Sequence, residues 1–280
     1  MVTYHHKNIL DGEIPGGIYL CQVGENVSCG ACCGLYNVAD PSREALAEML
    51  TLRTRAFAEV PRTVEGILSF KDETEHRECQ IRPYPEFHHC PYIGLIGDSL
   101  SRAGCLLHPL GKGNRGVDFR GLSYYGGMAC RTYFCPACKE LPPLYKKLIR
   151  ALAGDWYLYG LIVTEKQLLT AFFGEMEIRL GRTLCEGDFE NIMGNPAKVR
   201  CMRTFLQYRI QRPAAGSEPL CNYFFEDGLY GRKNTDDTGA GGKKSRYFRI
   251  FRELAWEFET ADALREAEKN LDEILECLTR

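Results

Sequence analysis

Three cysteines lie within five positions near the start of the chain, in the run Cys29-Gly30-Ala31-Cys32-Cys33. The C-x-x-C spacing of Cys29 and Cys32 lets two sulfur atoms turn toward one ion across a tight turn, and Gly30 gives the backbone freedom that such a turn needs. Thiolates are good ligands for zinc, Cu(I) and iron–sulfur clusters. The run therefore predicts a metal site.

Further potential sulfur ligands follow in three groups between residues 90 and 138. Cys90 follows two histidines and precedes a proline, and Cys105 follows a glycine, with His108 three positions on. The last group is the run "CRTYFCPAC". One C-x-x-C pair would be weak evidence, but this combination favours metal binding over a set of free thiols and occasional disulfides. The candidate metal ligands are Cys29, Cys32, Cys33, Cys90, Cys105, Cys130, Cys135, Cys138 and His108.

The doublet Cys32-Cys33 bears on the number of metal sites. Zinc takes four ligands in a tetrahedron, so the eight candidate cysteines suffice for two such sites. Successive side chains usually point apart, so we do not expect the two sulfurs of the doublet to share one mononuclear ion. The doublet either lies between two sites or beside a polynuclear one, or one sulfur binds metal while the other packs.

The identity of the metal stays open between zinc and iron. The spacing Cys130-x4-Cys135-x2-Cys138 matches the first three ligands of plant-type [2Fe–2S] ferredoxins, which favours an iron–sulfur cluster. Histidines 88, 89 and 108 also fit zinc or mononuclear iron, with His108 the best candidate of the three.

Composition restricts the other partners of the protein. The net charge of −2 predicts no general attraction to nucleic acid or acidic membranes. The sequence contains no run of about 18 apolar residues, so no membrane span is predicted. The start of the chain lacks the pattern of a signal peptide. We therefore expect a cytoplasmic protein in a reducing compartment, where disulfides are rare.

The distribution of the 14 cysteines divides the chain of 280 residues in two. We expect a cysteine-rich metal-binding region over 1–140 and a helical region over 141–280, although the two could form one continuous domain. The predicted fold class is α+β: a loop-rich cysteine-cluster region with short strands, packed on a mainly helical body. In the first region, a strand is predicted at 16–23, a helix beginning at Asp40-Pro41, and one or two short strands within 60–90.

In the second region, turn and capping signals predict four helices. They cover 142–154, a segment that follows a capping box of Thr164 and Gln167, a segment from Asn195-Pro196 to about Gln211, and the C-terminal segment. A mobile loop is predicted at 231–245 because that stretch has too little apolar surface to pack. The four isolated cysteines of this region are expected to be small buried hydrophobic residues: Cys185, Cys201, Cys221 and Cys277.

The stretches "SCGACCGL", "HCPY", "GCLLHP" and "ACRTYFC" together resemble the YkgJ-like cysteine-cluster family, a zinc- or iron-chelating domain with a CxxCxxCC signature. The resemblance covers residues 20–138 and implies metal chelation. The first cysteine of the signature falls on Asn26, so Cys21 is the candidate replacement, and Cys138 is a candidate local substitute. The family's cysteines fall on Cys29, Cys32, Cys33, Cys90, Cys105, Cys130 and Cys135.

Three functions follow, in decreasing order of preference. The first is a protein that chelates zinc or iron through clustered thiolates. The second is an iron–sulfur or iron-dependent enzyme. Its chemistry would be redox, or it would resemble the S-adenosylmethionine-dependent lysine N-methylases of flagellin, which some relatives of the family resemble. The third is a zinc-stabilised adaptor for nucleic acid or protein, suggested by basic residues at 198–212 and 242–249 and opposed by the overall acidity.

Overall fold

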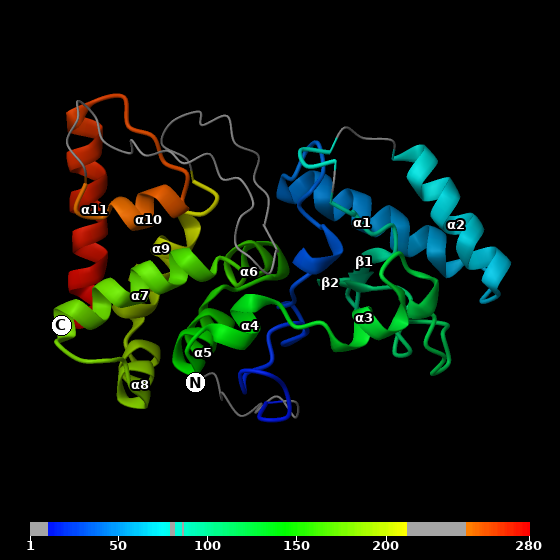
Figure 1. Ribbon diagram of the computed structural model, residues 1–280, viewed down its shortest axis with the longest axis horizontal. Helices are drawn as coiled ribbons and strands as arrows, with labels where there is room; N and C mark the ends of the chain where they lie inside the picture. The colour runs from blue at the N-terminus through cyan, green and yellow to red at the C-terminus, as the bar shows by residue number, and fades with distance from the viewer. Residues whose placement is uncertain (1–10, 79–81, 86, 212–244) are drawn as a thin grey trace.

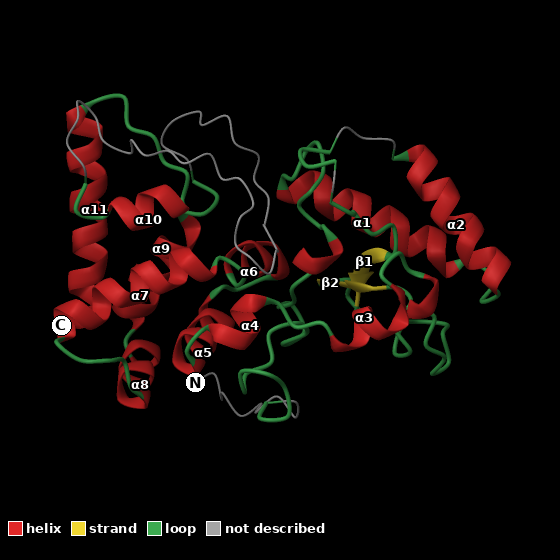
Figure 2. Cartoon of the chain, viewed as in Figure 1, coloured by secondary structure: helices red, strands yellow, loops and turns green. Residues whose placement is uncertain are grey.

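The computed structural model describes residues 11–78, 82–85, 87–211 and 245–280 (Figure 1). These residues are mostly helical and contain one small two-stranded antiparallel sheet (Figure 2). The predicted helical body with short strands is thus confirmed. Figure 1 shows α1, α2 and the sheet at one end of the molecule and α7–α11 at the other, with α4–α6 between them.

The cysteine-rich half contains short helices and loops around the sheet. Ser42 caps the first long helix by accepting a hydrogen bond from the Ala45 N–H, so this helix begins two residues after the predicted Asp40 cap. The elements are η1 (Ala31–Cys33), α1 (Arg43–Ala58), α2 (Val64–Arg77), β1 (Ile93–Ile96), β2 (Arg102–Cys105), η2 (Arg120–Leu122), α3 (Gly126–Thr132) and α4 (Pro136–Glu140).

Two strand predictions in this half are wrong. Residues 16–23 form a loop with one isolated bridge, between Gln22 and Ser28. Within the stretch 60–90 that was expected to hold short strands, residues 64–77 form α2 instead, because Thr63 caps this helix and Ile67 and Phe70 lie at helical spacing on its buried face.

The helical half follows from local sequence signals. Asn195 caps α9 through its side-chain oxygen, with Pro196 in the first turn as predicted. The predicted capping box at Thr164 is wrong, because α7 begins after Glu165 without a side-chain cap. The predicted loop at 231–245 lies almost wholly outside the described residues. The elements are α5 (Pro143–Leu152), α6 (Trp156–Ile162), α7 (Lys166–Leu180), α8 (Glu186–Gly194), α9 (Pro196–Gln207), α10 (Phe248–Glu253) and α11 (Ala261–Thr279).

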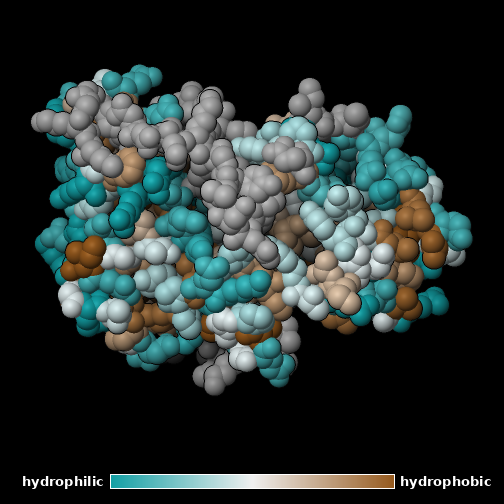
Figure 3. Space-filling view, in the orientation of Figure 1, coloured by the Kyte–Doolittle hydropathy of each residue, from teal (hydrophilic) through white to brown (hydrophobic). Residues whose placement is uncertain are grey.

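Hydrophobic packing joins the two halves. The largest core buries side chains of α5–α11 and also Ile18, Leu20 and Cys138, so it extends across the predicted boundary at residue 140. Two smaller cores lie beneath α1 and α2 around the sheet. Figure 3 shows a mostly hydrophilic described surface in this view, with small apolar patches. None of the described helices combines the length and the apolar character needed to cross a membrane.

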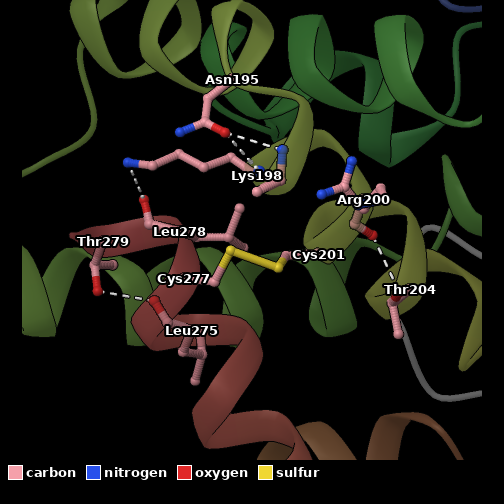
Figure 4. Close-up of a disulfide and its surroundings, with 10 residues drawn as sticks. Asn195, Lys198, Arg200, Cys201, Thr204, Leu275, Cys277, Leu278 and Thr279 are labelled. Atoms are coloured by element: carbon pink, nitrogen blue, oxygen red, sulfur yellow. Dashed lines mark hydrogen bonds between the residues drawn. A yellow bond between two sulfur atoms is a disulfide. The ribbon is translucent and has the colours of Figure 1, made fainter.

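A disulfide links two helices of the largest core. Cys201 of α9 is bonded to Cys277 of α11, 76 positions away in sequence (Figure 4). In the chain-entropy account, a disulfide that closes a loop of this length lowers the entropy of the unfolded chain and so stabilises the fold by about 4 kcal/mol. The expectation that these two cysteines are small buried hydrophobic residues is therefore wrong, because both are half-buried and joined to each other. Cys185 is also not buried: it is exposed at the start of α8, and Cys221 lies outside the described residues.

Candidate metal centre

Four thiols from three separate segments come close enough to influence one another's ionisation. Burial raises the pKa of Cys21, and negative charge on Cys32 and Cys135 raises it further. Burial likewise holds the pKa of Cys29 well above its usual value, again with contributions from Cys32 and Cys135. Burial raises the pKa of Cys135 to about 11, and the charges of Cys138 and Cys32 add to this shift. We call Cys21, Cys29, Cys32 and Cys135 the first thiol group.

A second set of four thiols is coupled in the same way. A hydrogen bond with Cys32 and burial hold the pKa of Cys33 well above its usual value, and the charges of Cys90 and Cys105 contribute. Burial raises the pKa of Cys90 to about 12, with contributions from Cys105 and Cys130. Burial raises the pKa of Cys105 to about 11, with a contribution from Cys130. We call Cys33, Cys90, Cys105 and Cys130 the second thiol group.

Main-chain hydrogen bonds bring these distant segments together. The chain turns back on itself between Gln22 and Ser28, which form a bridge, so the Cys29 N–H donates to the Cys21 carbonyl oxygen at 2.7 Å. Asn26 lies exposed in this turn. It is therefore Cys21, and not the residue at the signature position, that lies beside Cys29.

The second thiol group is assembled through the sheet. The Cys90 N–H donates to the Cys33 carbonyl oxygen at 2.8 Å, and the antiparallel register pairs Ile93 with Cys105. Gly94 permits α1 to pack on β1, since a Cβ there would lie 2.5 Å from Thr54 Oγ1. The sheet thus fixes Cys90 and Cys105 relative to the doublet.

At four of the thiols, the main-chain N–H two residues after the cysteine, in two cases together with the next N–H, lowers the pKa of the thiol. Such donors favour the thiolate and partly offset the effect of burial on the pKa, and metal-bound thiolates commonly accept bonds of this kind. The donor residues are Ala31 for Cys29, Tyr92 for Cys90, Leu107 and His108 for Cys105, and Ala137 and Cys138 for Cys135.

A sequence signal for this arrangement exists at two of the four positions. Cys90 and Cys135 are each followed by proline, which fixes φ and lacks an N–H of its own. The first donor available after the cysteine is then the amide two residues on.

The doublet contributes one sulfur to each group. Cys32 is exposed and Cys33 is half-buried on η1, and a hydrogen bond from the Cys33 side chain lowers the pKa of Cys32. Gly34 ends η1 with a φ of 71°, in the left-handed region that favours glycine.

Cys138 is oriented differently from the other predicted ligands. Its buried Sγ lies 3.6 Å from the Ile18 carbonyl oxygen and 3.7 Å from that of Pro15. Its negative charge raises the pKa of Cys21 and Cys135, so it lies near the first thiol group. Its hydrogen bonds nevertheless direct its thiol at the loop around residue 16.

The three candidate histidine rings make other contacts. His108 Nδ1 accepts a hydrogen bond from the Leu110 N–H at 3.1 Å, and the His108 N–H donates to the Cys105 carbonyl oxygen at 3.2 Å. His89 bonds through Nδ1 to the Gly34 carbonyl oxygen at 2.8 Å, and burial lowers its pKa to about 3. The ring of His88 stacks on that of Tyr124 with centroids 4.3 Å apart.

Across residues 11–78, 82–85, 87–211 and 245–280, no three or more Cys, His, Asp or Glu side chains are spaced to hold a metal ion as they stand. Four sulfurs bound tetrahedrally to zinc at about 2.3 Å would lie about 3.8 Å apart. Charged thiolates repel one another at that separation, so closing either thiol group to this distance requires a cation. The donor set consists of sulfur alone, which suits zinc or iron.

Gly34 offers a test of how the doublet is positioned. We expect Gly34→Ala to lower the free energy of unfolding by about 2–3 kcal/mol, since alanine is strained at positive φ. Its Cβ would also lie 2.2 Å from the His88 carbonyl oxygen. Urea denaturation would measure the change. Gly17→Ala is the matched control, because Gly17 has a φ of 72° and nothing within 4 Å of the added Cβ. Equal losses in both variants would contradict the role of the close contact.

Comparison of the chain with protein-family models, with curated proteins and with solved structures finds no match. The resemblance to the YkgJ-like cysteine-cluster family therefore depends on the four cysteine motifs alone, and it stays a prediction.

Proposed function

We propose that the protein chelates two ions of zinc or iron, one in each thiol group. The observation that carries this proposal is that separate cysteine-bearing segments lie side by side: the Cys29 N–H donates to the Cys21 carbonyl oxygen, the Cys90 N–H donates to the Cys33 carbonyl oxygen, and the strand register pairs Ile93 with Cys105. The pKa of each of the thiols at 21, 29, 33, 90, 105 and 135 is raised by burial, and the charge of neighbouring thiols contributes. Four thiolates complete a tetrahedral site. One sulfur of the Cys32-Cys33 doublet would then bind each ion.

The surroundings of the thiols support binding in the thiolate form. Four tetrahedral thiolates around a divalent ion leave a net charge of −2, which nearby donors and cations must offset. Main-chain N–H groups that lower the pKa of the thiols supply dipoles at both groups. At the second group, the Arg120 guanidinium, whose pKa is raised mainly by Asp118, also interacts with Cys105 and Cys130. A buried guanidinium, Arg53, lies near Cys90 and donates to its carbonyl oxygen at 3.1 Å.

The primary role that we propose for the ions is structural. The segments that carry the thiols have short elements and many loops, and metal binding contributes directly to folding in such regions. The cysteines of the two thiol groups would have to stay reduced to bind metal, whereas Cys201 and Cys277 are joined in a disulfide.

A second candidate is an iron–sulfur or iron-dependent enzyme, redox-active or methyl-transferring. One observation favours it: Tyr125, which is 49% exposed, lies near Cys33 and Cys90, whose charges raise its pKa after the larger effect of burial, and its ring contacts that of the exposed Tyr124. An exposed apolar surface of this kind can receive a substrate.

Elemental analysis of protein purified with and without oxygen tests the proposal. We expect two metal ions per chain in the wild type, one in Cys21→Ser, and two in Cys138→Ser, the matched control. Zinc would leave the protein colourless, whereas iron–sulfur would give a brown protein that absorbs near 400 nm. Fewer than one ion per chain in the reduced wild type would contradict the proposal, and loss of an ion from Cys138→Ser would contradict the assignment of Cys21.

A further inference from the structure

A single disulfide coexists with many free thiols in the part of the chain that the structure describes. Ten of the described cysteines are free, and Cys201 and Cys277 are bonded to each other. Free thiols persist where the surroundings are reducing, and the disulfides found in such surroundings are usually transient, catalytic or redox-sensing. This contrast singles out the bond between α9 and α11 as one that could open and close.

The two helices that the disulfide joins are also held together by other contacts. They pack against each other, and both bury apolar side chains in the largest core, among them Met202 and Phe205 of α9 and Leu275 of α11. Close to the disulfide, Lys198 Nζ donates to the Leu278 carbonyl oxygen at 3.4 Å (Figure 4). Because these contacts do not involve the sulfurs, the bond can open while the helices stay packed.

A groove of about 590 Å³ lies beside the disulfide, between α9 and α11. Most of the described residues that line it are at helical spacing from the two cysteines and so share a face with them, such as Thr204 and Tyr208 after Cys201 and Ile274 before Cys277. Cys201 itself lines the groove, whereas Cys277 is not among the lining residues. A thiol that enters the groove therefore meets the sulfur of Cys201 first.

The charges on the groove complement a small thiol that carries both a carboxylate and an ammonium group. Arg200 of α9 is exposed on the groove and forms no ion pair with another described residue. Glu273 of the facing helix is also exposed, with Lys269 Nζ 3.9 Å from its carboxylate. The guanidinium suits a carboxylate of the ligand, and the Glu273 carboxylate suits its ammonium group. The volume of the groove lies within the range of small-molecule sites, about 300–1,000 Å³.

We propose that this groove binds a small thiol with carboxylate and ammonium groups, of which glutathione is an example, and that the thiol opens the disulfide reversibly by attacking Cys201. Its thiolate donates an electron pair to Cys201 Sγ and forms a mixed disulfide, while the bond between Cys201 and Cys277 breaks. The electron pair of that bond leaves on Cys277 Sγ, which takes a proton from solvent. A second thiolate attacks the bound thiol's sulfur in the mixed disulfide, which releases Cys201 and the disulfide-linked dimer of the small thiol. Two small thiols thus lose one electron each, and the protein disulfide gains two.

Reaction of the full chain with reduced glutathione tests this inference. Acid quenching, alkylation of the free thiols and peptide mapping by mass spectrometry would follow the opening of the disulfide. We expect glutathione to be attached at Cys201 and Cys277 to be alkylated. Arg200→Ala should slow opening by glutathione about tenfold and leave opening by uncharged mercaptoethanol unchanged, because the guanidinium attracts only the charged thiol. Arg200→Lys should restore most of the rate.

Arg203→Ala is the matched control, because Arg203 is an exposed arginine of α9 that does not line the groove. This variant should open at the wild-type rate with both thiols. The proposal would be overturned by attachment of glutathione at Cys277, by a wild-type rate in Arg200→Ala, or by a disulfide that only a protein dithiol opens. Neither cysteine of the disulfide belongs to a thiol group, so each of these results leaves the proposed metal binding standing. Absence of metal from the wild type would in turn leave the exchange at Cys201 untouched.

Discussion

Complete removal of the metal, with the Cys201–Cys277 disulfide left intact, is expected to unfold the segments that carry the thiols, while α7–α11 stay folded. Structural zinc sites contribute an apparent 10–16 kcal/mol in zinc-finger peptides, about as much as the whole stability of a typical domain. Without the ions, the thiolates of each group repel one another, and burying them away from water costs free energy. The helices of the second half keep their large apolar core and the Cys201–Cys277 disulfide.

Hydrogen exchange measured by mass spectrometry would locate this change. We expect amides of residues 21–35 and 88–138 to lose protection after chelation and to regain it when zinc is returned. Amides of α9 and α11 serve as the internal control and should keep their protection. Unchanged exchange and melting after complete metal removal would show that the fold does not depend on the ions.

Arg53→Ala is expected to lower the free energy of unfolding by about 3–5 kcal/mol, the cost of breaking a buried ion pair from one side. Arg53 is only 1% exposed, although it lies in the middle of α1. Its guanidinium pairs with Glu78, which would keep a partly buried charge without a partner. It also bonds to the Cys90 carbonyl oxygen at 3.1 Å and to His89 Nε2 at 2.7 Å.

Urea denaturation of the metal-loaded protein would measure this loss. Arg55→Ala is the matched control, because Arg55 is an exposed arginine on the same helix and should change stability by less than about 0.5 kcal/mol. Because Arg53 holds the segment that leads into Cys90, the variant should also bind metal less tightly at the second thiol group. A loss below about 1 kcal/mol in Arg53→Ala would mean that Glu78 and His89 find other partners.

Features with a local cause could be predicted from the sequence. The helix over 142–154, the Asn195 cap and the apolar face of α11 all follow from residues within one or two turns of each other, and the structure confirms them. The start of α1 and the capping of α7 were predicted wrongly by one or two residues. At helix ends several neighbouring polar residues can serve as the cap, and small differences in packing select among them.

The candidate metal ligands followed from residue type and spacing, but their grouping did not. The sequence by itself determined which thiols could bind a soft metal, because that depends on the chemistry of sulfur and on short turns. Only the tertiary structure decided that Cys21 lies beside Cys29, that Cys138 bonds to the loop at Ile18, and that Cys201 pairs with Cys277. Contacts of this kind join segments whose separation is set by the packing of whole elements, and no local pattern encodes that separation.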